Sequence, residues 1–257
     1  MKRKGILVVS FGTSHLDTME KTIEVIEQEL QRKFEEYKVY RAFTSGMIIR
    51  KLKHVYGIHV DTVKEALKRM QEDGIEEILI QPTHIINGIE NDNMLEDMKE
   101  YQDSFKSIAV GTPLLSEVDD YKKVVKAIVE EIQLSQDEML VLMGHGSDHY
   151  ANASYPMLEY TFHALGHENV YIGTVESFPE LQDVMNKLEK SEKKKVVLLA
   201  FMLVAGEHAK NDMAGEEDSW KQVIRDAGYE VRVLLKGLGE FPKIRQIFEE
   251  HLQVAKG

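Results

Sequence analysis

Residues 139–149 read MLVLMGHGSDH, an apolar run followed by a Gly-His-Gly turn and a short polar segment. A short apolar run that ends at a glycine is typical of a strand buried on both faces of a parallel sheet. Because glycines flank His145, the backbone has the freedom to project this imidazole from the end of the strand. An exposed histidine in an ordinary turn would have the same sequence, so the position alone leaves its role open.

Seven further short runs are mainly apolar and are typical of strands, and segments with helical periodicity separate them. In one of these segments Ile23, Ile26, Leu30 and Phe34 recur every three or four residues, as on the buried face of a helix. This alternation predicts an α/β fold with parallel sheets covered by helices. The seven runs are GILVVSF (5–11), YKVYRAF (37–43), EEILIQP (76–82), KSIAVGT (106–112), ENVYIGT (168–174), KKVVLLAFM (194–202) and YEVRVLL (229–235).

The eight runs fall into two groups of four, on either side of a polar joint near residue 135. We therefore expect two similar domains, residues 1–135 and 136–257, each with a parallel four-stranded sheet flanked by helices. The halves also repeat weakly, since LVVSFGTSH resembles LVLMGHGSDH and NGIENDNM resembles AGEHAKNDM. If the halves arose by duplication, Gly12 is the counterpart of His145, and Glu90 is the counterpart of His208.

The composition limits the kind of function. The chain of 257 residues has no cysteine, which excludes disulfides, thiolate nucleophiles and thiolate metal sites. Its net charge of -12 argues against a nucleic-acid partner. The apolar stretch at residues 196–206 is about half the roughly 20 residues of a bilayer helix. We expect no membrane segment and no signal peptide, and therefore a cytoplasmic protein. The sequence does not determine the oligomeric state, and it is compatible with a homo-oligomer.

Two further polar residues follow predicted strands in the second half. Glu176 lies in VYIGTVESFPE and His208 lies in LVAGEHAKNDM, each directly after an apolar run. Either residue alone is equally typical of a helix terminus. Taken with His145 they place His, Glu and His at strand ends, where ligands bind in open α/β sheets. Two imidazoles and a carboxylate suit a divalent metal with open coordination positions, and cobalt, iron, nickel and zinc all fit.

Five segments of the chain occur together in a characteristic order. They are SFGTSH (10–15), PTHIINGIEND (82–92), MGHGSDHYAN (143–152), TVESFPE (174–180) and LVAGEHAKNDM (203–213). This combination resembles the anaerobic sirohydrochlorin cobaltochelatases, which insert metal without ATP, and the likeness runs over essentially the whole chain. The resemblance implies two α/β domains with a cleft between them, and insertion of Co²⁺ into sirohydrochlorin in anaerobic cobalamin synthesis.

The resemblance also implies roles for individual residues. It assigns His145, Glu176 and His208 as the metal ligands, and it places Glu90 at the same cleft. Since a neutral imidazole is a base near pH 7, we expect His145 to accept a pyrrole proton, with His208 as the competing assignment. Glu90 would take the second proton or attract the incoming cation. Alone, Glu90 is as readily explained as an acid in the first turn of a helix.

Sirohydrochlorin carries many carboxylates, so an acidic protein must bind them locally. Helix amino termini after FGTS and GHGS offer amide groups, and nearby hydroxyls add donors. The expected substrate contacts are Ser10, Thr13, Ser14, His84 and Ser147. The alternatives are iron insertion for siroheme, a carrier of metal or tetrapyrrole without catalysis, and a metal-dependent hydrolase on the same fold.

Overall fold

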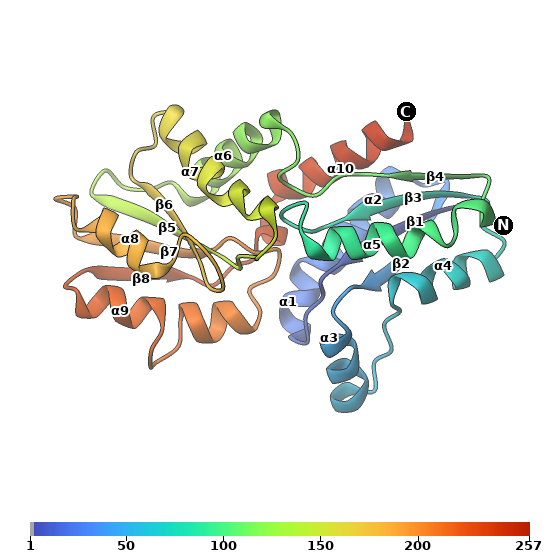
Figure 1. Ribbon diagram of the computed structural model, residues 1–257, viewed down its shortest axis with the longest axis horizontal. Helices are drawn as coiled ribbons and strands as arrows, with labels where there is room; N and C mark the ends of the chain where they lie inside the picture. Colours follow the sequence, from blue (N-terminus) through green and yellow to red (C-terminus); the bar gives the residue numbers. More distant parts are fainter. Residues whose placement is uncertain (1–2) are drawn as a thin grey trace. The chain divides into compact units, whose positions relative to one another are not determined.

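The computed structural model describes residues 3–257, so Met1 and Lys2, at the start of the first expected domain, lie outside the described part. The chain divides into two compact units, and each contains one parallel four-stranded sheet with helices on both faces (Figure 1). This confirms the predicted α/β class with two sheets. Among residues 3–257, no helix has the length and apolar character needed to cross a bilayer.

The first unit has the strand order β2-β1-β3-β4. Helices α4 and α5 cover one face of this sheet through an apolar cluster that includes Leu67, Met70 and Met94. On α2, Ile23, Ile26 and Leu30 are buried, as their spacing predicts. The elements are β1 (Lys4–Ser10), α1 (Leu16–Lys21), α2 (Ile23–Lys33), β2 (Tyr37–Phe43), α3 (Gly46–Lys51), η1 (Leu52–Tyr56), α4 (Val63–Glu72), β3 (Glu77–Pro82), α5 (Ile89–Lys99), η2 (Gln102–Ser104), β4 (Ser107–Val110) and, at the end of the chain, α10 (Pro242–Lys256).

The second unit repeats this arrangement with the strand order β6-β5-β7-β8. Helices α8 and α9 cover one face, where Val184 and Trp220 belong to the same apolar cluster as Val141 of β5. The elements are α6 (Val118–Ile132), β5 (Glu138–Gly144), η3 (Tyr150–Ala153), α7 (Ser154–Ala164), β6 (Val170–Thr174), α8 (Leu181–Leu188), β7 (Lys195–Ala200), η4 (Ala209–Met213), α9 (Trp220–Asp226), β8 (Glu230–Leu234) and η5 (Leu238–Glu240).

The division between the units differs from the expected boundary at residues 135 and 136. The first unit contains the chain up to Ser116 together with Ile244–Gly257, and the second contains Glu117–Lys243. Helix α6 joins the second unit, where it packs against α7 and has Ile128 on its buried face. Helix α10 returns to the first unit, where Arg245 pairs with Glu29 of α2 at 2.7 Å. The polar joint after α6 therefore marks a loop and not a domain boundary.

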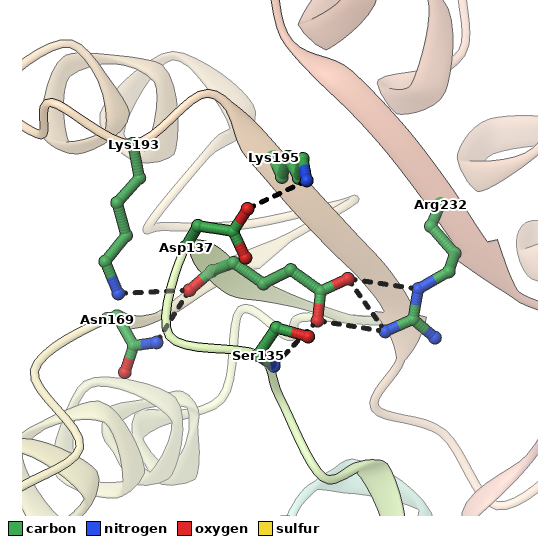
Figure 2. Close-up of polar contacts among 7 residues, drawn as sticks. Ser135, Asp137, Asn169, Lys193, Lys195 and Arg232 are labelled. Carbon is green, nitrogen blue, oxygen red and sulfur yellow. Dashed lines mark hydrogen bonds and ion pairs between the residues drawn. The ribbon is translucent and has the colours of Figure 1, made fainter.

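The amino ends of the second sheet are joined by a polar network around Glu138. Figure 2 shows its partners Ser135, Asn169, Lys193 and Arg232. The carboxylate of Glu138 accepts from the Ser135 N–H at 2.9 Å and pairs with Arg232 of β8 at 3.0 Å. Its main-chain carbonyl accepts from Asn169 at 2.8 Å and from Lys193 at 3.2 Å. Burial alone would raise the pKa of Glu138, but the Ser135 N–H and the Arg232 guanidinium together hold it below its ordinary value. The polar groups at this edge of the sheet therefore have hydrogen-bond or ion-pair partners within the network.

Candidate metal centre

Three strand ends of the second sheet carry the residues that the sequence singled out. His145 directly follows β5, and Glu176 comes two residues after β6. His208 stands immediately before η4, in the segment that follows β7. Because β5 lies between β6 and β7 in this parallel sheet, side chains at these three ends meet at one edge. The strand order thus brings together residues that are far apart in the sequence.

The three side chains form a compact set of nitrogen and oxygen donors. One ligand atom from each of His145, Glu176 and His208 lies within 4.8 Å of the other two. His145 Nε2 is 4.0 Å from Glu176 Oε1, and the two imidazole rings meet edge to face with their centroids 4.7 Å apart. The side chains are between 34% and 57% exposed, so an incoming ion can reach them. The predicted ligands are therefore gathered at an accessible site.

The Nδ1 atom of each histidine is held by a neighbouring oxygen. Nδ1 of His145 lies 3.0 Å from the carbonyl oxygen of Gly146, and Nδ1 of His208 lies 2.7 Å from Oδ2 of Asp212. In each contact the ring N–H donates and the oxygen accepts. With Nδ1 protonated in this way, Nε2 carries the lone pair that suits a metal ion.

The two glycines that flank His145 are both required by close approach. A Cβ atom on Gly144 would lie 2.4 Å from the ring of the buried Tyr155. Gly146 has a φ of +89°, and a Cβ atom there would lie 2.9 Å from the Ser177 nitrogen, one residue beyond Glu176. The Gly-His-Gly turn therefore presents the imidazole and also lets the loops after β5 and β6 pack together. Burial raises the pKa of Tyr155 to about 12, so this phenol stays neutral and is no proton acceptor near pH 7.

Asn152 joins the two loops that carry His145 and Glu176. Its Oδ1 accepts from the Ser147 N–H at 3.1 Å, and its Nδ2 donates to the Phe178 carbonyl at 2.5 Å. Sequence reasoning missed both Asn152 and Asp212. The position of Asp212 four residues after His208, on one helical face, was a signal that could have identified it. Asn152 offered no comparable pattern.

The predicted substrate contacts are distributed over both units. Ser147 is half-buried on the His145 loop, and its hydroxyl accepts from the His149 N–H at 3.1 Å. The other four belong to the first unit and are each at most 8% exposed. They are Ser10, Thr13, Ser14 and His84. Of the five predicted residues, only Ser147 lies on a loop that carries one of the predicted metal ligands.

His84 is an unusual member of this group. Neither of its ring nitrogens has a hydrogen-bond partner within residues 3–257, although the ring is buried. Burial lowers the pKa of His84 to about 4. The imidazole is therefore neutral at pH 7.

Glu90 lies in the first turn of α5 in the first unit, where it is half-buried. The three predicted ligands belong to the second unit, whereas Glu90 belongs to the first. A second set of His59, Asp61 and Glu65 also lies in the first unit. There Oδ1 of Asp61 already pairs with Arg69 at 2.7 Å and contacts His59 at 2.9 Å, so a cation would have to displace an arginine.

Comparison with known proteins identifies the family. A family model described as cobalt chelatase (CbiK) matches residues 4–256. The chain belongs to this family. It is 41% identical, over 98% of its length and 96% of the relative, to the sirohydrochlorin cobaltochelatase of Salmonella typhimurium. It is also 30% identical, over 99% of its length and 91% of the relative, to the sirohydrochlorin cobaltochelatase CbiKC of Nitratidesulfovibrio vulgaris.

Solved structures share the fold of this CbiK family member. SirB from Bacillus subtilis with Fe³⁺ superposes with a TM-score of 0.71 at 15% identity, covering 99% of this chain and 96% of SirB. A cobalt complex of the sirohydrochlorin chelatase SirB from Bacillus subtilis subspecies spizizenii gives a TM-score of 0.69 at 14% identity, covering 100% of this chain and 96% of SirB. The family and the fold expected from the sequence are both confirmed.

Proposed function

We propose that this chain is an ATP-independent sirohydrochlorin cobaltochelatase, which inserts Co²⁺ as a substrate into the tetrapyrrole. Membership of the cobalt chelatase family and two relatives named sirohydrochlorin cobaltochelatase support this function. The observation that carries it is the convergence of His145, Glu176 and His208 from three adjacent strand ends. No cysteine is present to form a tighter thiolate site.

The donor set suits a metal that must be bound and then released. Three nitrogen and oxygen donors leave coordination positions open, unlike a closed structural site with four ligands. The open positions admit pyrrole nitrogens while protein ligands still hold the ion. The same donors accept iron, so insertion of iron for siroheme is the alternative reaction, and cellular supply of the metal would decide between them.

Insertion also requires two pyrrole protons to leave the ring. We assign the first to Nε2 of His145 and the second to Glu90, with attraction of the incoming cation as the other role of Glu90. The net charge of -12 favours the approach of cations in either case.

Binding of the tetrapyrrole carboxylates is proposed for the five predicted contacts. Ser147 is best placed, because it shares a loop with His145. Ser10, Thr13, Ser14 and His84 are buried in the structure, so they would act from beneath a binding surface. Location in the cytoplasm, the oligomeric state and the lack of a nucleic-acid or membrane partner stay predictions.

The test is an anaerobic assay with purified protein, sirohydrochlorin and Co²⁺, in which the visible absorption change is compared with the spontaneous rate. We expect acceleration by the wild-type protein and none by H145A. The control is H167A, because His167 lies beside the amino end of the same sheet, near Leu140 and Val170. Bound tetrapyrrole with no acceleration by the wild type would instead support a carrier, and parallel reactions with Fe²⁺ compare the two metals.

A further inference from the structure

An exposed helical segment follows the carboxyl end of β2 in the first unit. It consists of α3 and η1, spans residues 46–56, and projects from the rest of that unit (Figure 1). Leu52 is its one buried residue. Three of its large apolar side chains are exposed, namely Met47 (67%), Val55 (62%) and Tyr56 (48%). Folding stability does not account for this surface, because apolar side chains that stay in water gain no burial energy.

Main-chain hydrogen bonds fix the base of this segment. The Thr44 N–H donates to the carbonyl of Ser10 at 2.9 Å, which ties the start of the segment to the end of β1. The Phe43 N–H donates to the carbonyl of Asp61 at 2.9 Å, so the chain leaves the sheet and returns to it at adjacent points. The segment is therefore held at the carboxyl edge of the first sheet, where ligands bind in open α/β sheets.

The same segment is basic, although the protein is acidic. Residues 37–60 contain no Asp or Glu, whereas 44 of the 257 residues of the chain are acidic. The exposed basic residues of the segment are Arg50, Lys51, Lys53 and His54. Among residues 3–257, neither Arg50 nor Lys53 pairs with a carboxylate. By contrast, Arg41 of β2 pairs with Glu27 at 2.5 Å. The segment thus presents positive charge that other parts of the protein do not neutralise.

This combination of cations and apolar side chains matches the chemistry of sirohydrochlorin, which has a flat conjugated ring system and many carboxylates. Met47, Arg50 and Lys51 are spaced by three and four residues, so they share one face of α3. An apolar side chain on that face can contact the ring while the adjacent cations bind carboxylates. A guanidinium binds a carboxylate through two parallel hydrogen bonds.

On these grounds, and resting on the proposed function, we infer that residues 46–56 bind the ring and the carboxylates of sirohydrochlorin, with Arg50 and Lys53 as the cations that set its affinity. A protein of net charge -12 needs local positive charge to bind a polyanion. The five contacts proposed above are hydroxyls and a neutral imidazole, so they do not supply it. The cations of this segment do.

The experiment measures the Kd for metal-free sirohydrochlorin under anaerobic conditions, from the change in its visible absorption on binding. R50Q/K53Q removes both charges and keeps polar side chains, so we expect the Kd to rise about 3–30-fold, as for loss of two exposed charge contacts. Its Kd should also depend less on salt concentration, because fewer ion pairs are screened. The matched control is K122Q/K126Q, which removes two exposed charges from α6 in the second unit. Its Kd should stay within twofold of the wild type.

A second variant tests the apolar part of the surface. M47Q replaces an exposed apolar side chain by a polar one, so we expect a higher Kd for sirohydrochlorin with the salt dependence of the wild type. Because Met47, Arg50 and Lys53 are all exposed, each variant should keep the wild-type Tm.

The outcomes separate the inference from the proposed function. A Kd for R50Q/K53Q within twofold of the wild type would overturn the inference, and so would an equal rise in K122Q/K126Q, which would indicate an effect of net charge. Loss of cosedimentation with phosphatidylserine vesicles in R50Q/K53Q, with an unchanged Kd for sirohydrochlorin, would assign the segment to an anionic lipid surface. If the wild type binds sirohydrochlorin through these cations but does not accelerate insertion, the inference is supported and the proposed function is wrong.

Discussion

Replacement of Gly146 by alanine tests whether the turn is shaped for the metal centre. Gly146 has a φ of +89°, and an alanine Cβ would lie 2.9 Å from both the Ser177 nitrogen and Thr174 Cβ. A left-handed backbone costs a residue with a Cβ about 1–2 kcal/mol. Displacing tightly packed neighbours adds about 1–3 kcal/mol. We therefore expect G146A to lower the free energy of unfolding by about 2–5 kcal/mol.

A matched control isolates the packing contribution. Gly166, beyond the end of α7, also has a φ of +89°, but nothing lies within 4 Å of a Cβ atom there. G166A should therefore cost only the backbone contribution of about 1–2 kcal/mol. Both glycines belong to the second unit, and so does Trp220, the one tryptophan of the chain. Urea unfolding followed by tryptophan fluorescence consequently reports on the unit that contains both changes.

The same pair of variants should differ in metal binding. In G146A the loop that carries Glu176 must move away from the His145 turn, so we expect the Kd for Co²⁺ to rise at least about tenfold, as for loss of a supporting contact at a metal site. In G166A the Kd should stay at the wild-type value. Equal losses of stability in the two variants, or unchanged Co²⁺ affinity in G146A, would refute the reasoning about close approach.

Three further outcomes are expected. N152A, which removes the link between the loops of His145 and Glu176, should weaken Co²⁺ binding about 10-fold or less with little change in Tm, and an unchanged Kd would contradict the bridging role of Asn152. The folded-state pKa of Glu138 lies below its ordinary value, so its contribution to stability is present above the unfolded pKa and is lost as the pH falls through the folded pKa. The stability difference between wild type and E138Q in urea titrations should therefore shrink from pH 7 to pH 3, and a constant difference would be inconsistent with this shift. For His84, burial keeps the folded ring neutral down to about pH 4 while the unfolded ring takes up a proton below about pH 6.5, so stability should fall between these values. H84Q should show a shallower decline over that interval in circular dichroism, and an identical slope would disprove the assignment.

Sequence alone was sufficient for the sheets and for the three residues that converge at the candidate metal centre. Short apolar runs that alternate with helical segments leave few arrangements other than parallel sheets, and a polar residue directly after such a run must lie at the carboxyl edge. His145, Glu176 and His208 were identified for this reason. Their convergence further depends on the strand order, which is set by tertiary packing.

Other features depended on contacts that are invisible in a linear pattern. The boundary expected at residue 135 was misplaced because a polar loop in the sequence looks the same within a domain as between domains. Ser10 ends β1, and Thr13 and Ser14 follow it, but all three are buried. Ser10 accepts a hydrogen bond from Thr83 at 2.8 Å. The Asn152 side chain bridges two loops by bonding the main-chain atoms of Ser147 and Phe178. Because such contacts do not depend on the types of the partner residues, the sequence gives no pattern that predicts them.

If the two halves arose by duplication, their shared strand order allows equivalent positions in the two sheets to be compared. Gly12, the counterpart of His145 in the sequence repeat, has a φ of +99°, and a Cβ atom there would lie 2.5 Å from the ring of Phe43. A histidine cannot take this position while Phe43 fills the space beside it. A metal-binding histidine at the corresponding position of the first sheet would therefore require at least two coordinated substitutions, one at Gly12 and one at Phe43.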